Sequence, residues 1–425
     1  MLDSPAASTL PPSFHIEEDG RAFRLDPRDP HFFANPYPTY VALHRTAPLA
    51  FWHEAGCLAV VSHPLVERVL KSRDFGRVLS EDGSGRAPAR EIADHLRHFQ
   101  EVEAHSLLDL EAPAHTRLRT LLTRAFVSRR VEALAPTITT IAHELIDRFD
   151  PSGPVELVSA FAEPLPVAVI AGLIGVPRED AGHLLRWSHA MVAMYQMGRT
   201  PEVELAADAA AREFRDYLVA LIAEKRRKTG DDLVSALAEA ETDKGKLSDA
   251  ELVSLVVLLL NAGHEATVHQ IGNALAAFAR SGVPLAPLAE NEPLLERTVE
   301  EALRFDTPLH LFRRFALRDV ELGKTTLKRG EEVALLLAAA NHDPTVFPEP
   351  DRFDPSRPRI PHVSFGAGVH FCIGAPLARL ELKLAFRSLA ERYPDLQPIA
   401  PPRFRDSYHF RGVERLDVTL QPKGE

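Results

Sequence analysis

The chain has 425 residues, of which 45% are apolar, so it can bury a large core. Its formal net charge of −11 argues against a general affinity for nucleic acid or anionic membranes, although local basic patches remain possible. Two cysteines, Cys57 and Cys372, are too few for a disulfide framework or a multi-cysteine zinc site and indicate a reducing compartment. The N-terminal residues lack a basic start followed by a long apolar run, so we expect a cytoplasmic protein without signal peptide or membrane anchor.

Small and polar residues at the start of the chain predict a loose arm over residues 1–20, with order beginning near Pro27. Apolar residues at helical spacing predict helices over 63–72, 113–149, 201–228, 247–281 and 293–305. Short apolar runs predict strands over 58–62, 314–322, 332–337 and 413–420.

Two stretches, 76–107 and 342–364, read as long irregular loops, which a bound cofactor would explain. No repeat or linker interrupts residues 30–420. The sequence therefore predicts a mainly α fold with small β-sheets (α+β), in which residues 21–425 form a single large domain.

A glycine-rich segment from Phe365 to Gly374 contains Cys372, and Pro376 then opens an apolar-periodic run to about Tyr393. We expect Cys372 just before a helix N-terminus, where free N–H groups and the helix dipole stabilise a thiolate. The glycines let backbone amides turn toward the sulfur. An inert buried cysteine and a reactive nucleophile are the alternatives; the glycine density disfavours the first, and the lack of a catalytic signature disfavours the second.

The pattern Phe365-x-x-Gly368-x-x-x-Cys372-x-Gly374 resembles the heme-binding loop of the cytochrome P450 family. The resemblance implies that Cys372 ligates the iron of heme b as a thiolate, which favours O–O cleavage. It also implies a single P450-type domain and places Phe365, Gly368 and Gly374 beside the cofactor.

Glu301 and Arg304 lie three residues apart on one predicted helix face, a spacing most often found in solvated surface pairs. Followed by Arg352 and the cysteine loop, they resemble the family's structural Glu-Arg-Arg network. The resemblance implies that these three side chains brace the core behind the heme.

His115 and Arg119 lie four residues apart and can reach one partner from the same helix face. A buried cation needs a pairing anion, which the carboxylates of the heme propionates would supply. The resemblance assigns propionate contacts to His115, Arg119, Arg314 and His370, with His362 a weaker candidate. Ordinary surface charge is the alternative.

The segment Ala262-Gly263-His264-Glu265-Ala266-Thr267 lies within the longest predicted helix, where Gly263 has no side chain to block a flat macrocycle. It resembles the family's oxygen-activating stretch, in which an acid precedes a threonine that helps to deliver protons. Glu265 is the acid, but Ala266 fills the threonine position, and Thr267 is turned about 100° further around the helix. Thr267 could act after a helix kink, a substrate hydroxyl or ordered water could relay the proton, or oxygen activation could be poorly coupled. We favour substrate assistance.

The resemblance places the substrate pocket between the 76–107 stretch and mostly apolar side chains, with two histidines as polar exceptions: Leu259, Leu309, His310, Phe312 and His409. Three methionines, Met191, Met194 and Met197, fall in one predicted helical stretch. They predict either a deformable pocket lid or routine core filling.

The resemblance implies a monooxygenase that inserts one oxygen atom from O₂ into a small, mostly apolar substrate by hydroxylation or epoxidation. No flavin or nicotinamide fingerprint is present, so we expect electrons to come from outside the chain. The resemblance to soluble bacterial members of the family implies a ferredoxin with its reductase. An acidic donor could dock on a predicted basic face comprising Arg117, Arg124, Arg129, Arg130, Arg379 and Lys383. The alternatives are a peroxide-driven or isomerising heme enzyme and a non-catalytic heme ligand sensor or carrier.

Overall fold

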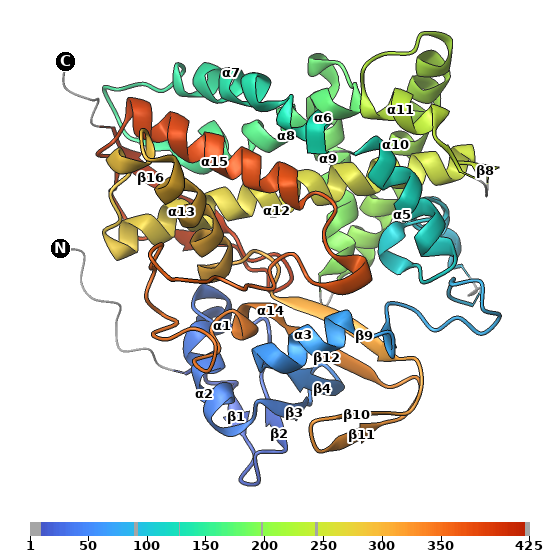
Figure 1. Ribbon diagram of the computed structural model, residues 1–425, viewed down its shortest axis with the longest axis vertical. Helices are drawn as coiled ribbons and strands as arrows, with labels where there is room; N and C mark the ends of the chain where they lie inside the picture. The colour runs from blue at the N-terminus through green and yellow to red at the C-terminus, as the bar shows by residue number, and fades with distance from the viewer. Residues whose placement is uncertain (1–9, 89–91, 127, 197–198, 243–244, 421–425) are drawn as a thin grey trace.

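The computed structural model describes residues 10–88, 92–126, 128–196, 199–242 and 245–420. Helices form most of the fold and stack above a smaller part that contains the main β-sheet (Figure 1). The helices are α1 (Pro30–Ala34), α2 (Tyr37–Thr46), α3 (His63–Lys71), α4 (Arg97–Glu103), α5 (Ala114–Ala125), α6 (Ser128–Glu132), α7 (Ala135–Ile146), α8 (Pro164–Ile174), α9 (Ala181–Val192), α10 (Pro201–Arg227), α11 (Leu233–Glu239), α12 (Asp249–Ser281), α13 (Glu292–Phe305), α14 (Leu337–Ala340) and α15 (Ala375–Arg392). The predicted mainly α fold is confirmed.

The main sheet has the strand order β1-β2-β3-β4-β12-β9-β5. These strands are β1 (His15–Ile16), β2 (Ala22–Arg24), β3 (Leu49–Trp52), β4 (Cys57–Val60), β12 (Glu332–Leu336), β9 (Leu311–Ala316) and β5 (Phe75–Gly76). β12 pairs in parallel with β4 and antiparallel with β9, so Val333 lies opposite both Leu58 and Arg314.

The remaining strands form small sheets in the order β10-β11, β13-β16-β6, β14-β15 and β7-β8. They are β6 (Val155–Glu156), β7 (Glu241–Thr242), β8 (Gly245–Lys246), β10 (Val320–Leu322), β11 (Thr325–Leu327), β13 (Gln397–Pro398), β14 (Arg403–Phe404), β15 (Val413–Arg415) and β16 (Asp417–Thr419).

Helix α12 crosses the middle of the molecule and packs against α8, α9, α13 and α15 (Figure 1). A capping box between Ser248 and Glu251 starts the helix, and Gly282 ends it in the left-handed conformation with φ +65°. Among the described residues, only this helix is long and apolar enough to cross a membrane, and 83% of its most apolar window is buried inside the protein. Its apolar length is therefore accounted for by the core that forms around it.

The structure agrees with most predicted helices but divides the 113–149 segment into α5, α6 and α7. Phe126 leaves the helical conformation, and Pro136 lies in the first turn of α7, where proline is favoured. Helix α8 was missed because it is apolar on nearly every side and has no helical period. The 76–107 stretch is not wholly irregular, since it contains α4, whereas 342–364 contains no helix or strand.

The predicted strands also needed adjustment. The 314–322 segment is two strands, β9 from Leu311 and β10, and the 413–420 segment divides into β15 and β16. Regular pairing begins at His15 rather than near Pro27, and Ser13 donates a hydrogen bond to Asp29. Residues 1–9 of the predicted arm lie outside the described residues.

Candidate active site

Cys372 lies two residues before Gly374, the N-cap residue of α15, as predicted. The Cys372 N–H donates to the carbonyl oxygen of Phe365 at 3.0 Å, and the amides of Gly374 and Ala375 donate to its sulfur. Gly368 has φ +70°, and a Cβ there would come within 2.3 Å of the Leu70 carbonyl oxygen. Only glycine therefore fits at this turn of the loop.

Burial raises the pKa of the Cys372 thiol, while the two amides and the charge of Arg119 act in the opposite direction. The effect of burial is the largest, and the positive charge of a metal ion at the sulfur would favour the thiolate form. This chemistry fits an iron ligand. Cys57, in contrast, is buried in β4, where burial raises the pKa of its thiol to about 11.

Arg314 is a buried cation on β9. Its side chain donates to the backbone carbonyl of Arg313 at 2.8 Å, and no carboxylate of the described residues lies within ion-pair distance. Burial lowers the pKa of Arg314 to about 9, with Arg77 acting in the same direction. An unpaired buried guanidinium is costly, so Arg314 fits an anionic group such as a heme propionate.

Residues of α5 and the cysteine loop meet beside Arg314. The rings of His115 and His370 lie 4.3 Å apart, and Arg119 donates to the carbonyl oxygen of Phe371 at 2.7 Å. Burial and His370 lower the pKa of His115 to about 4, so this ring is neutral at pH 7. Sequence reasoning missed Glu111, whose carboxylate lies 2.9 Å from Nε2 of His370; Glu111 offered no signal beyond its place just before α5.

His362 does not join this group. Its Nε2 lies 3.2 Å from Oε2 of Glu300, and its Nδ1 accepts from the Ser364 N–H. Both ring nitrogens therefore have partners, and the weaker propionate assignment of His362 is corrected. Arg379 pairs with the same Glu300 carboxylate at 2.6 and 2.9 Å and lies over the Phe365 ring at 4.7 Å.

Glu301 and Arg304 form the predicted pair in a fully buried position, with two hydrogen bonds of 2.8 and 2.7 Å. Arg357 is the third member of the network, since its Nε donates to Glu301 at 3.1 Å. The assignment of Arg352 was wrong for its side chain, which is 64% exposed and lies near Glu349. Arg352 contributes only its backbone carbonyl, which accepts from both arginines.

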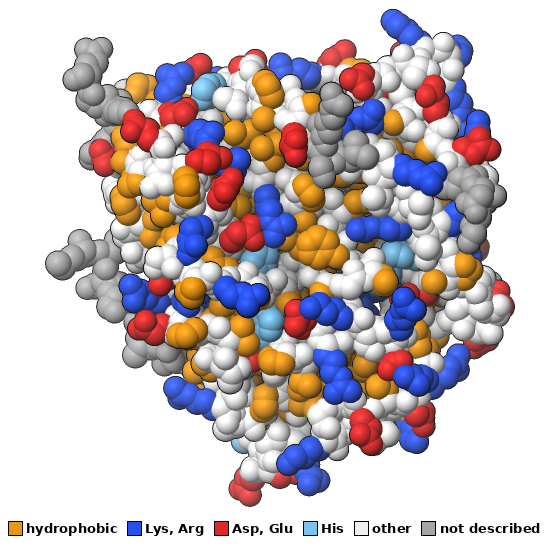
Figure 2. All heavy atoms as spheres, in the orientation of Figure 1, with side chains coloured by type: hydrophobic (Ala, Val, Ile, Leu, Met, Phe, Trp, Pro, Cys, Tyr) orange, Lys and Arg blue, Asp and Glu red, His pale blue; other side chains and the backbone are white. Residues whose placement is uncertain are grey.

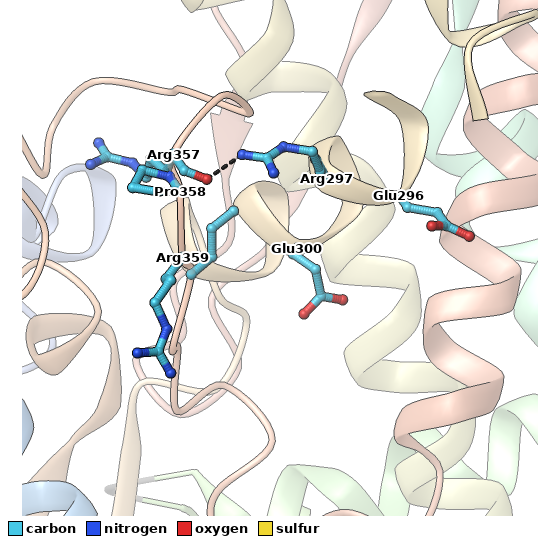
Figure 3. Close-up of a pocket in the computed structure, with 7 residues that line it drawn as sticks. Glu296, Arg297, Glu300, Arg357, Pro358 and Arg359 are labelled. Carbon is cyan, nitrogen blue, oxygen red and sulfur yellow. Dashed lines mark hydrogen bonds between the residues drawn. The ribbon is translucent and has the colours of Figure 1, made fainter. Parts of the chain in front are cut away.

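A pocket of about 230 Å³ lies beside this network (Figure 3). Charged residues of α13 and of the chain around Arg357 line it, and Arg297 donates to the Arg357 carbonyl across it. Such a charged lining does not match the apolar substrate pocket that we predicted.

On α12, near the segment that resembles the oxygen-activating stretch, Ala262 is exposed and Leu258 and Ala266 are half-buried, although most of the surrounding helix is buried. These residues are four apart and share one face of α12. Gly263 differs from our expectation: a Cβ there would meet Cδ1 of Ile170 on α8 at 3.1 Å. Close packing against α8 therefore explains this glycine, and Ala262 and Ala266 border the open face.

Thr267 is buried and turned away from that face. Its hydroxyl donates to the carbonyl oxygen of Gly263 at 3.1 Å, and α12 stays helical throughout this segment. Because the Gly263 carbonyl holds this hydroxyl within an uninterrupted helix, Thr267 is not placed to replace a hydroxyl at position 266.

Glu265 is buried and both of its carboxylate oxygens have neighbours. Oε1 lies 3.1 Å from Nε2 of His269 and 3.6 Å from Arg405, while Oε2 lies 3.4 Å from His189 and 3.5 Å from His264. Burial acts to raise the pKa of Glu265, but hydrogen bonds from His189 and His269 and the charges around it hold the pKa well below its usual value. The carboxyl group is therefore ionised.

The predicted pocket residues occupy different environments. Leu259 is buried in α12, Leu309 forms a β-bridge with Phe410, and Phe312 is half-buried on β9. His310 is buried 2.8 Å from the Tyr40 hydroxyl, among aromatic rings, so it belongs to the core beneath the sheet rather than to the pocket.

His409 is half-buried, with its ring 6.1 Å from that of Tyr195. Tyr195 donates to Glu103, whose pKa is raised to about 7 by burial and by Asp109. Sequence reasoning missed this polar pair.

Met191 and Met194 are core residues, which supports routine core filling over a deformable lid, and Met197 lies outside the described residues.

Comparisons with known proteins agree with this geometry. A family model described as Cytochrome P450 matches residues 287–406. "Cytochrome P450 107B1" of Saccharopolyspora erythraea is 41% identical over 354 residues, which cover 82% of this chain and 84% of the relative. "6-deoxyerythronolide B hydroxylase" of the same organism is 36% identical over 92% of this chain and 97% of its own length.

Among solved structures, P450BioI in complex with an acyl carrier protein ligated to hexadec-9Z-enoic acid superposes with a TM-score of 0.85 and 33% identity. The match covers 92% of this chain and 99% of the other. Close likeness in sequence along most of both chains, together with the same fold, shows that this chain belongs to the cytochrome P450 family of heme-thiolate monooxygenases.

Proposed function

We propose that this P450 acts in the cytoplasm and hydroxylates or epoxidises a small, mostly apolar substrate, with electrons from a ferredoxin and its reductase. The observation that carries the proposal is the open face of α12, where Ala262 is exposed and Ala266 is half-buried near the ionised Glu265. An apolar face next to a buried carboxylate can hold an apolar substrate close to a group that relays protons.

Heme b supplies the iron that activates O₂ when it is bound. Cys372 would hold it through the sulfur, and Arg314, with His115 and Arg119, would hold its propionates. These assignments rest on the buried Cys372 and on the buried Arg314, which has no carboxylate partner in the described part of the chain.

The ionised Glu265 would relay protons rather than store them, and His189 connects it to solvent because the His189 side chain is 37% exposed and lies 3.4 Å from Oε2. Ala266 offers no hydroxyl, and the Thr267 hydroxyl is held by the Gly263 carbonyl. A hydroxyl of the substrate, or a water that it orders, would then complete the path from Glu265. We therefore propose substrate-assisted proton delivery.

The experiment compares product formed per NAD(P)H consumed for wild type and Ala266→Thr, after substrates have been found by their shift of the heme spectrum. Wild type is expected to couple tightly on a hydroxyl-bearing substrate and loosely on the matched analogue without the hydroxyl. Ala266→Thr restores coupling on that analogue. Thr267→Val is the matched control and leaves coupling unchanged. Tight coupling of wild type on apolar substrates without any hydroxyl would contradict the proposal.

Dependence on a redox partner separates the proposed monooxygenase from the alternatives. Product formation that needs O₂, ferredoxin and reductase supports it. Turnover with peroxide alone, or isomerisation without electrons, would favour the other heme enzymes, and a spectral response without any product would favour a sensor.

We propose a docking surface for ferredoxin away from the predicted basic face, whose charges are largely paired. Figure 2 shows acidic side chains among the Lys and Arg residues that spread over the visible face. Most members of the predicted basic face have acidic neighbours: Arg117 with Glu251, Arg130 with Asp231, Arg379 with Glu300, and Lys383 with Glu292. The Arg129 side chain lies outside the described residues.

Two apolar side chains of the cysteine loop are exposed instead, Val369 by 59% and Phe371 by 40%. Arg119 binds the Phe371 carbonyl at their edge. We therefore propose that ferredoxin docks over Val369 and Phe371, close to the Cys372 sulfur.

Val369→Glu is expected to slow reduction by an acidic ferredoxin several-fold, because it places a like charge at the centre of the contact. Val219→Glu, at a 52% exposed position on α10, is the matched control and leaves the rate unchanged. Equal rates for both variants, with unaltered heme spectra, would contradict the docking surface.

A further inference from the structure

Three potential metal ligands other than Cys372 meet between α9 and α12. They are Nε2 of His189 on α9 and, on α12, Nε2 of His264 and a carboxylate oxygen of Glu265, and all three atoms lie within 4.8 Å of one another. Oε2 of Glu265 lies 3.4 Å from Nε2 of His189 and 3.5 Å from Nε2 of His264. Two helices therefore direct three ligand atoms toward one point.

One of these ligand atoms, Nε2 of His264, is an unsatisfied polar atom within the described part of the chain. The His264 side chain is fully buried, its Nδ1 lies 2.8 Å from the Leu260 carbonyl oxygen, and its Nε2 has no hydrogen-bond partner among the residues that the structure describes. The contact with Leu260 requires the proton on Nδ1, so Nε2 carries a bare lone pair. That lone pair faces the acceptor oxygen of Glu265, an arrangement that is unfavourable unless a cation or a donor lies between them.

The spacing matches a small tetrahedral metal ion. Zinc binds nitrogen and oxygen at about 2.0–2.2 Å, which places neighbouring tetrahedral ligands about 3.4 Å apart. The two edges that include Glu265 already have this length. The two histidine nitrogens lie within 4.8 Å of each other, and the partly exposed His189 can adjust this distance by turning its side chain.

The groups behind the ligands also suit a metal site. Ligating histidines commonly donate their other N–H to a backbone carbonyl, as His264 does to Leu260. His269 and Arg405 hold Oε1 of Glu265, so Oε2 is the oxygen that faces the two histidines of the site. Glu163 lies 3.9 Å from Nε2 of His189 and adds a negative charge, which offsets the positive charge of Arg405.

We propose that His189, His264 and Glu265 bind one Zn²⁺ ion, with water as the fourth ligand. Two neutral imidazoles, one carboxylate and an open position are a common zinc ligand set. The ion joins α9 to α12. If Glu265 relays protons as proposed above, zinc also blocks that relay and inhibits turnover, but zinc binding itself does not depend on this role.

The test uses the untagged ferric holoenzyme, freed of loose metal with a chelator and then dialysed against buffered Zn²⁺. The ratio of zinc to heme is measured by elemental mass spectrometry for wild type, His189→Gln and His183→Gln. His183 is the matched control because it is an exposed histidine of the same helix that contacts Arg186 instead.

Wild type and His183→Gln are expected to take up one more zinc per heme than His189→Gln, whose affinity falls at least tenfold. Zinc also raises the melting temperature of wild type but not of His189→Gln, because only a folded site binds the ion. An unaltered heme spectrum shows that each variant is folded. Equal zinc uptake by wild type and His189→Gln would overturn the proposal, as would the absence of any uptake.

Discussion

Replacing Arg357 by alanine should destabilise the protein far more than replacing Arg352, although the sequence predicted Arg352, and not Arg357, as the third member of the buried network. Arg357 donates to Glu301 at 3.1 Å and to the carbonyl oxygens of Pro348, Glu349 and Arg352 at 2.6, 2.8 and 2.9 Å. Its loss leaves buried acceptors without donors, and breaking a buried ion pair costs about 3–5 kcal/mol.

Arg352→Ala removes only a contact with Glu349 between side chains that are 64% and 74% exposed. Solvent screens such a pair, so its loss changes the free energy of unfolding by at most about 0.5 kcal/mol.

Urea unfolding of the ferric holoenzyme, followed by tryptophan fluorescence and by heme absorbance, measures both effects. At a slope of about 3 kcal/mol per M, Arg357→Ala lowers the midpoint by about 1 M or more, while Arg352→Ala leaves it nearly unchanged. A loss for Arg352→Ala as large as that for Arg357→Ala would refute the assignment.

Three further variants test other features of the structure. Arg314→Gln should release heme to apomyoglobin roughly 10- to 100-fold faster than wild type, because it loses a charge-assisted contact. Arg313→Gln is the control and should not change the rate, since Arg313 pairs with Glu332. Equal rates for the two variants would refute the role of Arg314. Gly368→Ala should destabilise more than Gly282→Ala, since both have positive φ but only Gly368 would clash, and a similar loss contradicts the clash. Glu381 is 1% exposed, and burial raises its pKa well above the usual 4.5. The folded state therefore binds this proton more tightly than the unfolded state does. The free energy of unfolding falls as the pH rises above about 4.5. Glu381→Gln should therefore gain stability over wild type from about pH 5 to pH 8, and a constant difference would disprove it.

Features that depend on a few neighbouring residues were predicted from the sequence. The start of α15 after Cys372 follows from Gly374 and Pro376, and the turn at Gly368 needs a residue that tolerates positive φ. The Glu301–Arg304 pair follows from helical spacing. Long helices such as α10 and α12 were found because their apolar periods persist over many turns.

Partners that are distant in sequence were not predicted, because they depend on how the elements pack. Arg352 and Arg357 lie five residues apart in the same irregular loop, and only the path of that loop decides which side chain reaches Glu301. The same holds for His362, which meets Glu300, and for Thr267, which faces away from Ala266.

The sequence by itself indicated the family, pointed to Cys372 as the heme ligand and showed the missing hydroxyl at Ala266, since each is a matter of residue identity within a short segment. The tertiary structure alone decided that Arg314 is a buried cation with no carboxylate of the described residues within ion-pair distance, that Gly263 packs on Ile170, and that His189 from α9 meets Glu265. The physical reason is that burial and pairing are set by the elements that surround a side chain, and those elements come from distant parts of the chain.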